Sequence, residues 1–232
     1  YGEQVGLNYQ VTATSCFLCA TQLANGTSLK ELDEELQYQQ SHYAHIPHVL
    51  SSDYLAEFQS WVSALRSKES IPDWDLMITL KDEEMVLAMH SILRLQMAYL
   101  FQNEQQAVHI LENIRESIHT MSSLPTAPTY YFYRALWQFD FLKQQKKHRR
   151  QYVDEIKESL RKFKKWSKEA PHIYEHLYML LLAENCCMKH LDGEALLYYD
   201  RAIQLAKVNK FPQDIAISYE RAAKYYEAHT LS

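Results

Sequence analysis

The chain has 232 residues, of which 47% are hydrophobic and 23% are charged, and its formal net charge is -5. It can bury a substantial core, and its negative charge gives no general reason to expect binding to nucleic acid or to an anionic membrane. Only four glycines and six prolines are present, which argues against a turn-rich β-sandwich and favours helices.

The N-terminal half has the periodicity of a series of helices. Apolar residues recur at helical spacing from Val11 to Leu23, and Asn25-Gly26 supplies a stop. Ser28 and Glu31 have the spacing of a capping box, so a second helix is expected to begin there and to run to about His45. Further helices are expected over about 52–66, over 80–101, and from the turn "QNEQQ" to about Met121.

The helical pattern resumes after a break at "SSLPTAPT", residues 122–129. Its two prolines predict a connection between an N-terminal part, residues 1–121, and a C-terminal part, residues 130–232. An aromatic helix and a basic amphipathic helix follow, and Pro171 and Pro212 stand where further helices can begin. About ten helices and no convincing strand make the predicted fold all-α.

A gapless internal match indicates a repeat. "AYLFQNEQQAVHILENIR" (98–115) aligns with "CCMKHLDGEALLYYDRAI" (186–203), which pairs Ala107 with Ala195. In both copies a helix ends in a short turn, and the next helix begins just before an alanine that allows close packing of two antiparallel helices. This pattern predicts a TPR-like superhelical array built from two-helix units of roughly 34 residues, with an unrelated helical bundle as the alternative. The apolar pairs that follow are Leu111 with Tyr199 and Ile114 with Ala202.

The chain also carries a family resemblance, which covers most of it and is most specific over residues 163–226. Trp166 and Pro171 precede a helix with the pair Ala183-Glu184, and "YDRAIQLAKVNKF" and "ERAAKYY" follow. This stretch resembles the helical region of very large bacterial multidomain signalling kinases. In those proteins a Ser/Thr-kinase-like domain and a regulatory ATPase module precede the helical region, and histidine-kinase modules often follow it. The resemblance implies a TPR-like regulatory or interaction segment of a cytoplasmic signal-transduction protein.

The resemblance carries over no catalytic residues, because the chain has no kinase or ATPase motif. It also has no phosphate-binding glycine-rich loop, no G-x-S-x-G and no H-E-x-x-H. We therefore expect no enzymatic activity, no metal and no cofactor in this chain. The chain begins at Tyr1 without a methionine, and its apolar pattern still continues at the C-terminus, so we expect a segment of a longer protein.

The four cysteines have two interpretations. Cys16 and Cys19 form a C-x-x-C motif, and Cys186-Cys187 could complete a four-thiolate zinc site. Both pairs lie in apolar helical runs, where a free cysteine packs as a small hydrophobe, so core packing is preferred. Four cysteines in a chain of this size do not form a secreted disulfide framework, and no apolar run approaches the roughly 20 residues that span a bilayer. A cytoplasmic location without membrane insertion is therefore expected.

The histidines raise a second possibility of metal binding. His42, His45 and His48 recur every third residue, whereas His172 and His176 have the i, i+4 spacing that can place two imidazoles on one metal. A proline interrupts the first set, and no acidic or thiol ligand follows close to the second. Surface histidines are the preferred interpretation for both sets.

The run from Lys143 to Lys168 contains eleven lysines and arginines. A surface for nucleic acid or anionic lipid is one interpretation. We prefer a solvated helix face, because Tyr152, Ile156 and Phe163 form an apolar stripe opposite the cations. Such a positively charged face can nonetheless dock an acidic neighbouring domain.

Five residues are candidate contacts for a partner. The first helix of each pair lines the concave surface of a TPR-like array, and Gln96, Tyr99 and Glu184 occupy outward positions of such helices. The aromatic residues around Tyr133 and Trp137 cover more than one helix face, so some of them can contact a partner. We predict a non-catalytic segment that binds a protein, a peptide or another domain of the same polypeptide, and not nucleic acid. The alternative is a small-molecule sensing domain with a pocket near Tyr133 and Trp137.

Overall fold

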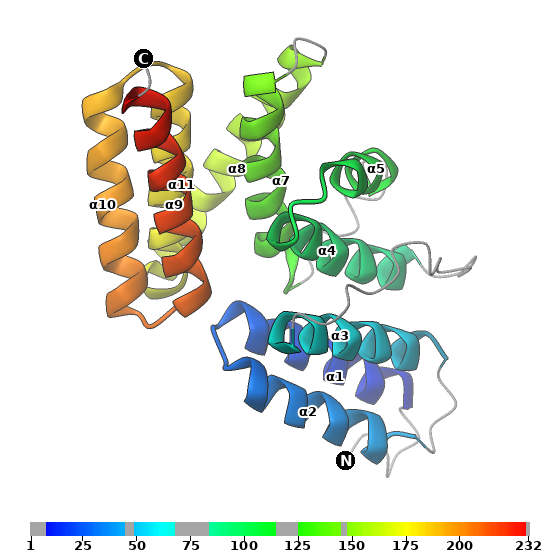
Figure 1. The fold of residues 1–232 in the computed structure, drawn as a ribbon. Helices are drawn as coiled ribbons and strands as arrows, with labels where there is room; N and C mark the ends of the chain where they lie inside the picture. Colours follow the sequence, from blue (N-terminus) through cyan, green and yellow to red (C-terminus); the bar gives the residue numbers. More distant parts are fainter. Residues whose placement is uncertain (1–7, 45–48, 68–83, 115–124, 145–147, 231–232) are drawn as a thin grey trace. The chain divides into compact units, whose positions relative to one another are not determined.

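The computed structural model describes residues 8–44, 49–67, 84–114, 125–144 and 148–230. Ten α-helices and no strand occur in these residues, which confirms the predicted all-α class (Figure 1). The helices are α1 (Asn8–Ala24), α2 (Leu29–His42), α3 (Val49–Ser67), α4 (Glu84–Leu100), α5 (Glu104–Ile114), α7 (Ala127–Gln144), α8 (Arg149–Glu169), α9 (Pro171–Met188), α10 (Asp192–Val208) and α11 (Pro212–Thr230).

The helix boundaries follow the local signals of the sequence closely. Pro171 and Pro212 are the first residues of α9 and α11, as predicted. The capping box also forms, because the Ser28 hydroxyl accepts from the Glu31 N–H at 3.2 Å and the Glu31 carboxylate accepts from the Ser28 N–H at 3.3 Å. The predicted connection at 122–129 overlaps the start of α7, which begins at Ala127. The predicted helical residues 80–83 and 115–121 lie outside the described residues.

The chain divides into two compact units, Tyr1–Tyr130 and Tyr131–Ser232. In the first unit, helices that follow one another in the sequence pack together, as α2 does on α3 and α4 on α5, while α1 contacts both α2 and α3. Its core is apolar and includes two of the cysteines. The buried residues of this core include Cys16, Cys19, Leu32, Leu36, Phe58, Trp61, Val62, Leu93 and Met97.

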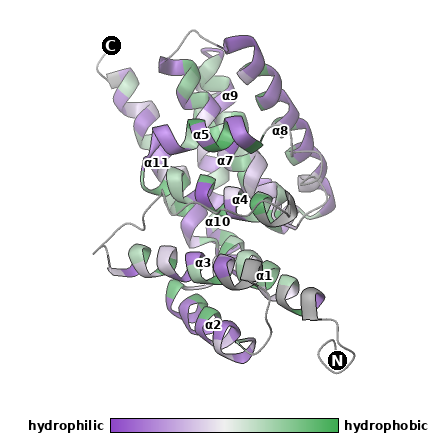
Figure 2. Ribbon diagram, turned by 90° about the vertical axis from the view of Figure 1, so that its right-hand side faces the viewer, coloured by the Kyte–Doolittle hydropathy of each residue, from purple (hydrophilic) through white to green (hydrophobic). Residues whose placement is uncertain are grey.

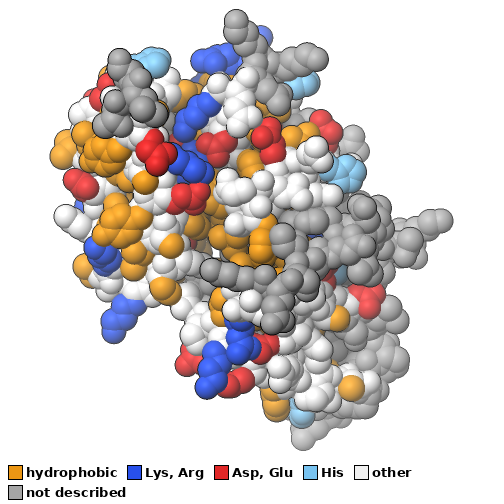
Figure 3. All heavy atoms as spheres, viewed as in Figure 1, with side chains coloured by type: hydrophobic (Ala, Val, Ile, Leu, Met, Phe, Trp, Pro, Cys, Tyr) orange, Lys and Arg blue, Asp and Glu red, His pale blue; other side chains and the backbone are white. Residues whose placement is uncertain are grey.

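The second unit is also built from helices that are neighbours in the sequence. Helix α9 packs between α8 and α10, and α11 packs on α10 and contacts α9. Helix α7 is joined to α8 by Arg134, whose Nη2 donates to the Glu155 carbonyl and to the Ser159 hydroxyl at 3.0 Å each. The outer face of α10 stays partly apolar, since Leu197 and Val208 are 72% and 77% exposed (Figure 3).

Four helix–helix turns share one backbone geometry. In the first of them, Gly26 has φ of 78° and the Thr27 N–H donates to the Gln22 carbonyl at 3.0 Å. Gln102, His190 and Lys210 have φ of 55°, 58° and 62°, the left-handed conformation that commonly ends a helix. In each turn the N–H of the next residue donates to the carbonyl five residues earlier. In the other three turns these bonds are Asn103 to Ala98 at 2.8 Å, Leu191 to Cys186 at 3.0 Å, and Phe211 to Ala206 at 3.0 Å.

The shared turn coincides with the internal match in the sequence. That alignment places Gln102 opposite His190, and the alanines that follow, Ala107 and Ala195, are both fully buried. Both alanines are thus buried, as the prediction of close packing at these positions requires. The TPR-like arrangement of the whole chain stays a prediction.

Candidate functional site

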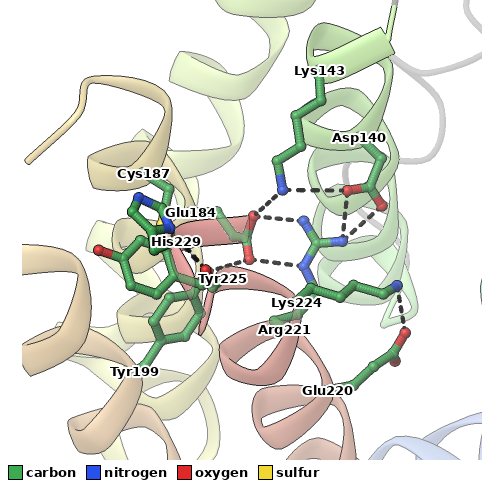
Figure 4. Close-up of polar contacts among 10 residues, drawn as sticks. All are labelled: Asp140, Lys143, Glu184, Cys187, Tyr199, Glu220, Arg221, Lys224, Tyr225 and His229. Carbon is green, nitrogen blue, oxygen red and sulfur yellow. Dashed lines mark hydrogen bonds and ion pairs between the residues drawn. The ribbon is translucent and has the colours of Figure 1, made fainter. Parts of the chain in front are cut away.

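Arg221 of α11 is the centre of a buried charge network in the second unit (Figure 4). This residue is only 1% exposed. Nε donates to Glu184 Oε1 at 2.8 Å and Nη2 donates to Glu184 Oε2 at 2.5 Å. Nη1 lies 2.8 and 2.7 Å from the two carboxylate oxygens of Asp140. All three nitrogens of the guanidinium group therefore bind a carboxylate.

Glu184 of α9 is the second member of the network and is also 1% exposed. Besides Arg221, it accepts a hydrogen bond from the Tyr199 hydroxyl at 2.6 Å, and Lys143 Nζ lies 3.5 Å from its carboxylate. Burial by itself would raise the pKa of Glu184, but Arg221, Lys143 and Tyr199 together lower this pKa to about 2. Glu184 is therefore ionised at neutral pH although it is buried.

The network is balanced in charge and reaches solvent at one end. Asp140 and Glu184 supply two negative charges, and Arg221 and Lys143 supply two positive ones. Lys143 Nζ also lies 3.7 Å from Asp140, and its side chain is 56% exposed. A buried ion pair is tolerated when its geometry is good and its remaining donors and acceptors are satisfied, and both conditions hold for Arg221. We refer to Asp140, Lys143, Glu184, Tyr199 and Arg221 as the Arg221 network.

Tyr199 connects the network to a thiol. Burial and the nearby charge of Glu184 raise the pKa of the Tyr199 hydroxyl well above its usual value. The hydroxyl therefore stays protonated and donates a hydrogen bond to Glu184. Cys187 Sγ lies 3.5 Å from this hydroxyl oxygen. Burial raises the pKa of the Cys187 thiol, which disfavours the reactive thiolate. At neutral pH the Tyr199 hydroxyl and the Cys187 thiol are thus both protonated, beside the ionised Glu184.

The network residues come from four helices that are not all adjacent in the sequence. Asp140 and Lys143 are one turn apart on α7, Glu184 lies on α9, Tyr199 on α10 and Arg221 on α11. Arg221 and Asp140 are separated by 81 residues. The guanidinium group therefore joins α7, α9 and α11, which alternate along the chain with α8 and α10.

Glu184 is the one predicted site residue that belongs to the Arg221 network. Its predicted outward orientation is wrong, because Arg221 compensates its charge in the interior. The other four predicted residues are also buried, each 5% exposed or less: Gln96, Tyr99, Tyr133 and Trp137.

The structure does not bring the five predicted residues together in one unit. Gln96 and Tyr99 lie on α4 in the first unit, whereas Tyr133, Trp137 and Glu184 lie in the second. The Trp137 ring stacks on Phe141 with centroids 5.6 Å apart. Direct contact of these side chains with a partner stays a prediction.

Sequence reasoning missed Arg221, Asp140 and Lys143. The signal for Arg221 was available, because it falls in the same helical stripe as Ile217 and Tyr225, both of which are buried. A charged residue inside an apolar stripe indicates a buried ion pair. The spacing of residues along the sequence does not indicate that its partner is Asp140 of α7, which is 81 residues away.

Three of the four cysteines are buried, and Cys187 is partly exposed. Cys16 and Cys19 belong to the apolar core of the first unit, and burial raises the pKa of Cys19 to about 12. Cys186 and Cys187 lie on α9, and all four cysteines are free thiols. Among the described residues, no group of three or more His, Cys, Asp or Glu side chains has the arrangement to hold a metal ion.

The histidines divide into exposed and buried positions. His42 and His172 are exposed, whereas His45 and His48 lie outside the described residues. The surface position predicted for His176 is wrong. This side chain is 1% exposed, because its Nε2 lies 2.8 Å from Asp214 Oδ2 and its ring stacks on Phe211 at 4.7 Å.

Comparisons of the chain with models of known protein families, with characterised proteins and with solved structures give no significant match. The resemblance to bacterial signalling kinases accordingly depends on the sequence features of residues 163–226. Within the part of the chain that the structure describes, no helix combines the length and the apolarity required to cross a membrane.

Proposed function

We propose that this chain is a non-catalytic scaffold segment of a cytoplasmic signal-transduction protein and that it binds a protein, a peptide or a neighbouring domain. The observation that carries the proposal is the Arg221 network. Its donors meet acceptors within the second unit, and its formal charges cancel. Such a network stabilises the placement of helices and leaves no buried charge unpaired for a substrate.

The protonation behaviour of the network also supports a role in binding. A general acid or base works best with a pKa near neutral pH. The pKa of Glu184 is instead lowered to about 2, although burial opposes this shift, and the pKa of the Tyr199 hydroxyl is raised by burial and by Glu184. Burial raises the pKa of the Cys187 thiol as well. None of these groups is adjusted for proton transfer or nucleophilic attack at neutral pH.

The arrangement of the helices supports a scaffold more specifically. Successive helices pack as neighbours in each unit, and the left-handed turn recurs after α1, α4, α9 and α10. Stacked helix pairs of this kind present extended helix faces, and these faces are the surfaces that repeat proteins use to bind partners. The resemblance of residues 163–226 to the helical region of bacterial signalling kinases gives the same expectation.

The proposal is tested by affinity capture with the complete 232-residue chain, followed by measurement of direct binding between purified components. We expect at least one protein or domain to bind the purified chain with one-to-one stoichiometry in calorimetry. The matched controls are Arg221→Gln, which removes the charge at the centre of the network, and Arg201→Gln, which removes an exposed charge from α10.

If binding requires an intact scaffold, we expect Arg221→Gln to weaken it and Arg201→Gln to leave it unchanged. The proposal is wrong if no protein or domain binds and a metabolite screen instead finds a small molecule that raises the melting temperature of the chain by several degrees. That result would favour the alternative function, a small-molecule sensing domain with a pocket near Tyr133 and Trp137.

A further inference from the structure

A row of exposed cations runs along α8. Lys157, Arg161, Lys164 and Lys168 are spaced by four, three and four residues, which places them on one face of the helix. All four side chains are exposed. We call them the basic stripe; they span about 16 Å, or three helical turns. Figure 2 shows α8 as hydrophilic along most of its length.

The acidic residues in the middle of α8 are engaged with α7 instead of the basic stripe. Glu158 accepts a hydrogen bond from Arg134 Nη2 at 2.9 Å, and Glu155 accepts one from the Gln138 side chain. Both donors are buried side chains of α7. Two of the four carboxylates of α8 are thus engaged with α7, while the four cations of the stripe face solvent.

Most of the basic stripe lacks an internal counter-charge. Lys157 Nζ lies 3.1 Å from Asp154 at the N-terminal end of the stripe. Among the described residues, Arg161, Lys164 and Lys168 have no carboxylate within ion-pair distance. The chain as a whole has a net charge of -5, so this helix face differs in sign from the rest of the protein.

We propose that the basic stripe docks an acidic α-helix of the partner or neighbouring domain. Carboxylates at the same spacing of four, three and four residues on one face of a helix match the four cations over three turns. This inference rests on the scaffold function proposed above, and it identifies the surface and the chemistry of the partner.

A helix fits the stripe better than a nucleic acid does. The stripe itself contains no aromatic side chain on which a base could stack, and Trp166 of the same helix packs against Tyr131 and Tyr174 inside the second unit. The net negative charge of the chain also opposes a polyanion as dense as DNA. Exposed ion pairs are individually weak and are screened by salt, so the contact is expected to depend strongly on ionic strength.

The test uses fluorescence anisotropy with the complete chain and a labelled, alanine-rich helical peptide that carries four glutamates at the stripe spacing. A scrambled peptide of the same composition is the control ligand. We expect the ordered peptide to bind at least fivefold more tightly than the scrambled one. We also expect binding to weaken roughly tenfold or more between about 50 and 300 mM NaCl.

Two triple variants with the same change in net charge separate the stripe from general electrostatics. Lys157→Glu, Arg161→Glu and Lys164→Glu reverse the stripe, whereas Lys30→Glu, Lys189→Glu and Lys210→Glu reverse exposed cations elsewhere. The stripe variant is expected to bind the peptide at least tenfold more weakly, and the control variant within twofold of the native chain.

Circular dichroism establishes whether both variants fold. If the stripe variant does not, the neutral pair Arg161→Gln and Lys164→Gln replaces it, with an expected threefold loss. Equal losses in the stripe and control variants overturn the inference. Tighter stripe-dependent binding of a 20-base-pair DNA duplex or of phosphatidylserine vesicles overturns it as well.

The inference and the scaffold function can fail separately. If a captured protein binds the stripe variant as tightly as it binds the native chain, the stripe is not the docking surface, although the scaffold function stands. If no protein or domain binds the chain, the scaffold function itself fails.

Discussion

The α4–α5 pair and the α9–α10 pair have the same turn but different interiors. Gln102 and His190 both adopt the left-handed conformation, and a fully buried alanine follows each turn by five residues. Four positions after that alanine the pairs differ, since α5 has Leu111 and α10 has Tyr199, whose hydroxyl binds Glu184.

This comparison separates the residues that make a helix pair from those that connect it to other helices. The turn and the alanine are shared, and they are sufficient for two antiparallel helices to pack closely. The polar connection to α7 and α11 occurs in the second pair, where Tyr199 and Glu184 are present. Changes to the network should therefore affect the second unit alone. Equivalent changes to the turn or to the alanine should have similar effects in the two pairs.

The largest effect is expected for Arg221→Ala. This change leaves Glu184 and Asp140 without their shared cation, and breaking a buried ion pair costs about 3–5 kcal/mol. Urea unfolding followed by circular dichroism measures the loss. The matched control is Arg201→Ala, which removes an exposed arginine 3.6 Å from Glu175 and should cost less than about 1 kcal/mol. Equal costs for the two variants would show that the network contributes no more than a surface ion pair.

The second-largest effect is expected in the pH dependence of stability, through the lowered pKa of Glu184. Although burial opposes the shift, Arg221 and its neighbours lower the folded pKa of Glu184 to about 2, below the unfolded value of about 4.3. A depressed folded pKa adds stability that is fully present above the unfolded pKa and is lost as the pH falls toward 2. The contribution of this group is at most about 3 kcal/mol.

Urea midpoints between pH 7 and pH 3 measure this contribution. Glu184→Gln should lower the stability at pH 7 and flatten its decrease at acid pH. Glu220→Gln, at an exposed ion pair of α11, should leave the slope nearly unchanged. An unchanged slope in Glu184→Gln would contradict the assignment.

A smaller and shared effect is expected for Ala107→Leu and Ala195→Leu. Both alanines are fully buried after the same turn, so a larger side chain forces the paired helices apart and costs about 1–3 kcal/mol at either position. The control is Ala216→Leu at an exposed position of α11, which should change stability by less than about 0.5 kcal/mol. A cost at one alanine and none at the other would show that the two pairs do not share their packing.

The smallest effect should be a gain in stability. Glycine adopts the left-handed conformation without steric cost, so His190→Gly should stabilise the chain by about 0.5–1 kcal/mol. Gln102→Gly should gain less, because the Gln102 side chain donates to the Tyr99 carbonyl at 2.7 Å and that bond is lost. His172→Gly, in the first turn of α9, is the control and should destabilise the chain. Thermal unfolding ranks the three variants.

Features that depend on a few neighbouring residues could be predicted from the sequence. The capping box of Ser28 and Glu31, the helix starts at Pro171 and Pro212, and the close-packed alanines all express short-range rules. The all-α class follows from the same periodicity. Hydrogen bonds and steric limits within a few residues are sufficient to determine these features.

The site could not be predicted to the same extent, because its contacts are long-range. Glu184 lies among apolar residues of α9, yet its orientation depends on Arg221, which is 37 residues away. His176 was expected at the surface for the same reason, since its partner Asp214 lies at the start of α11. A charged residue in an apolar stripe shows that a counter-charge is needed, but the counter-charge itself is located only once the helices are packed.

The single guanidinium group of Arg221 also has a consequence for how the second unit opens. In a stack of helices that touch only their neighbours, an outer helix can detach while the rest remains folded. Arg221 links α11 to α7 as well as to α9, so α11 cannot separate without breaking bonds to both helices. Amide hydrogens of α11 should therefore exchange as slowly as those of α9, and the second unit should open as one cooperative block.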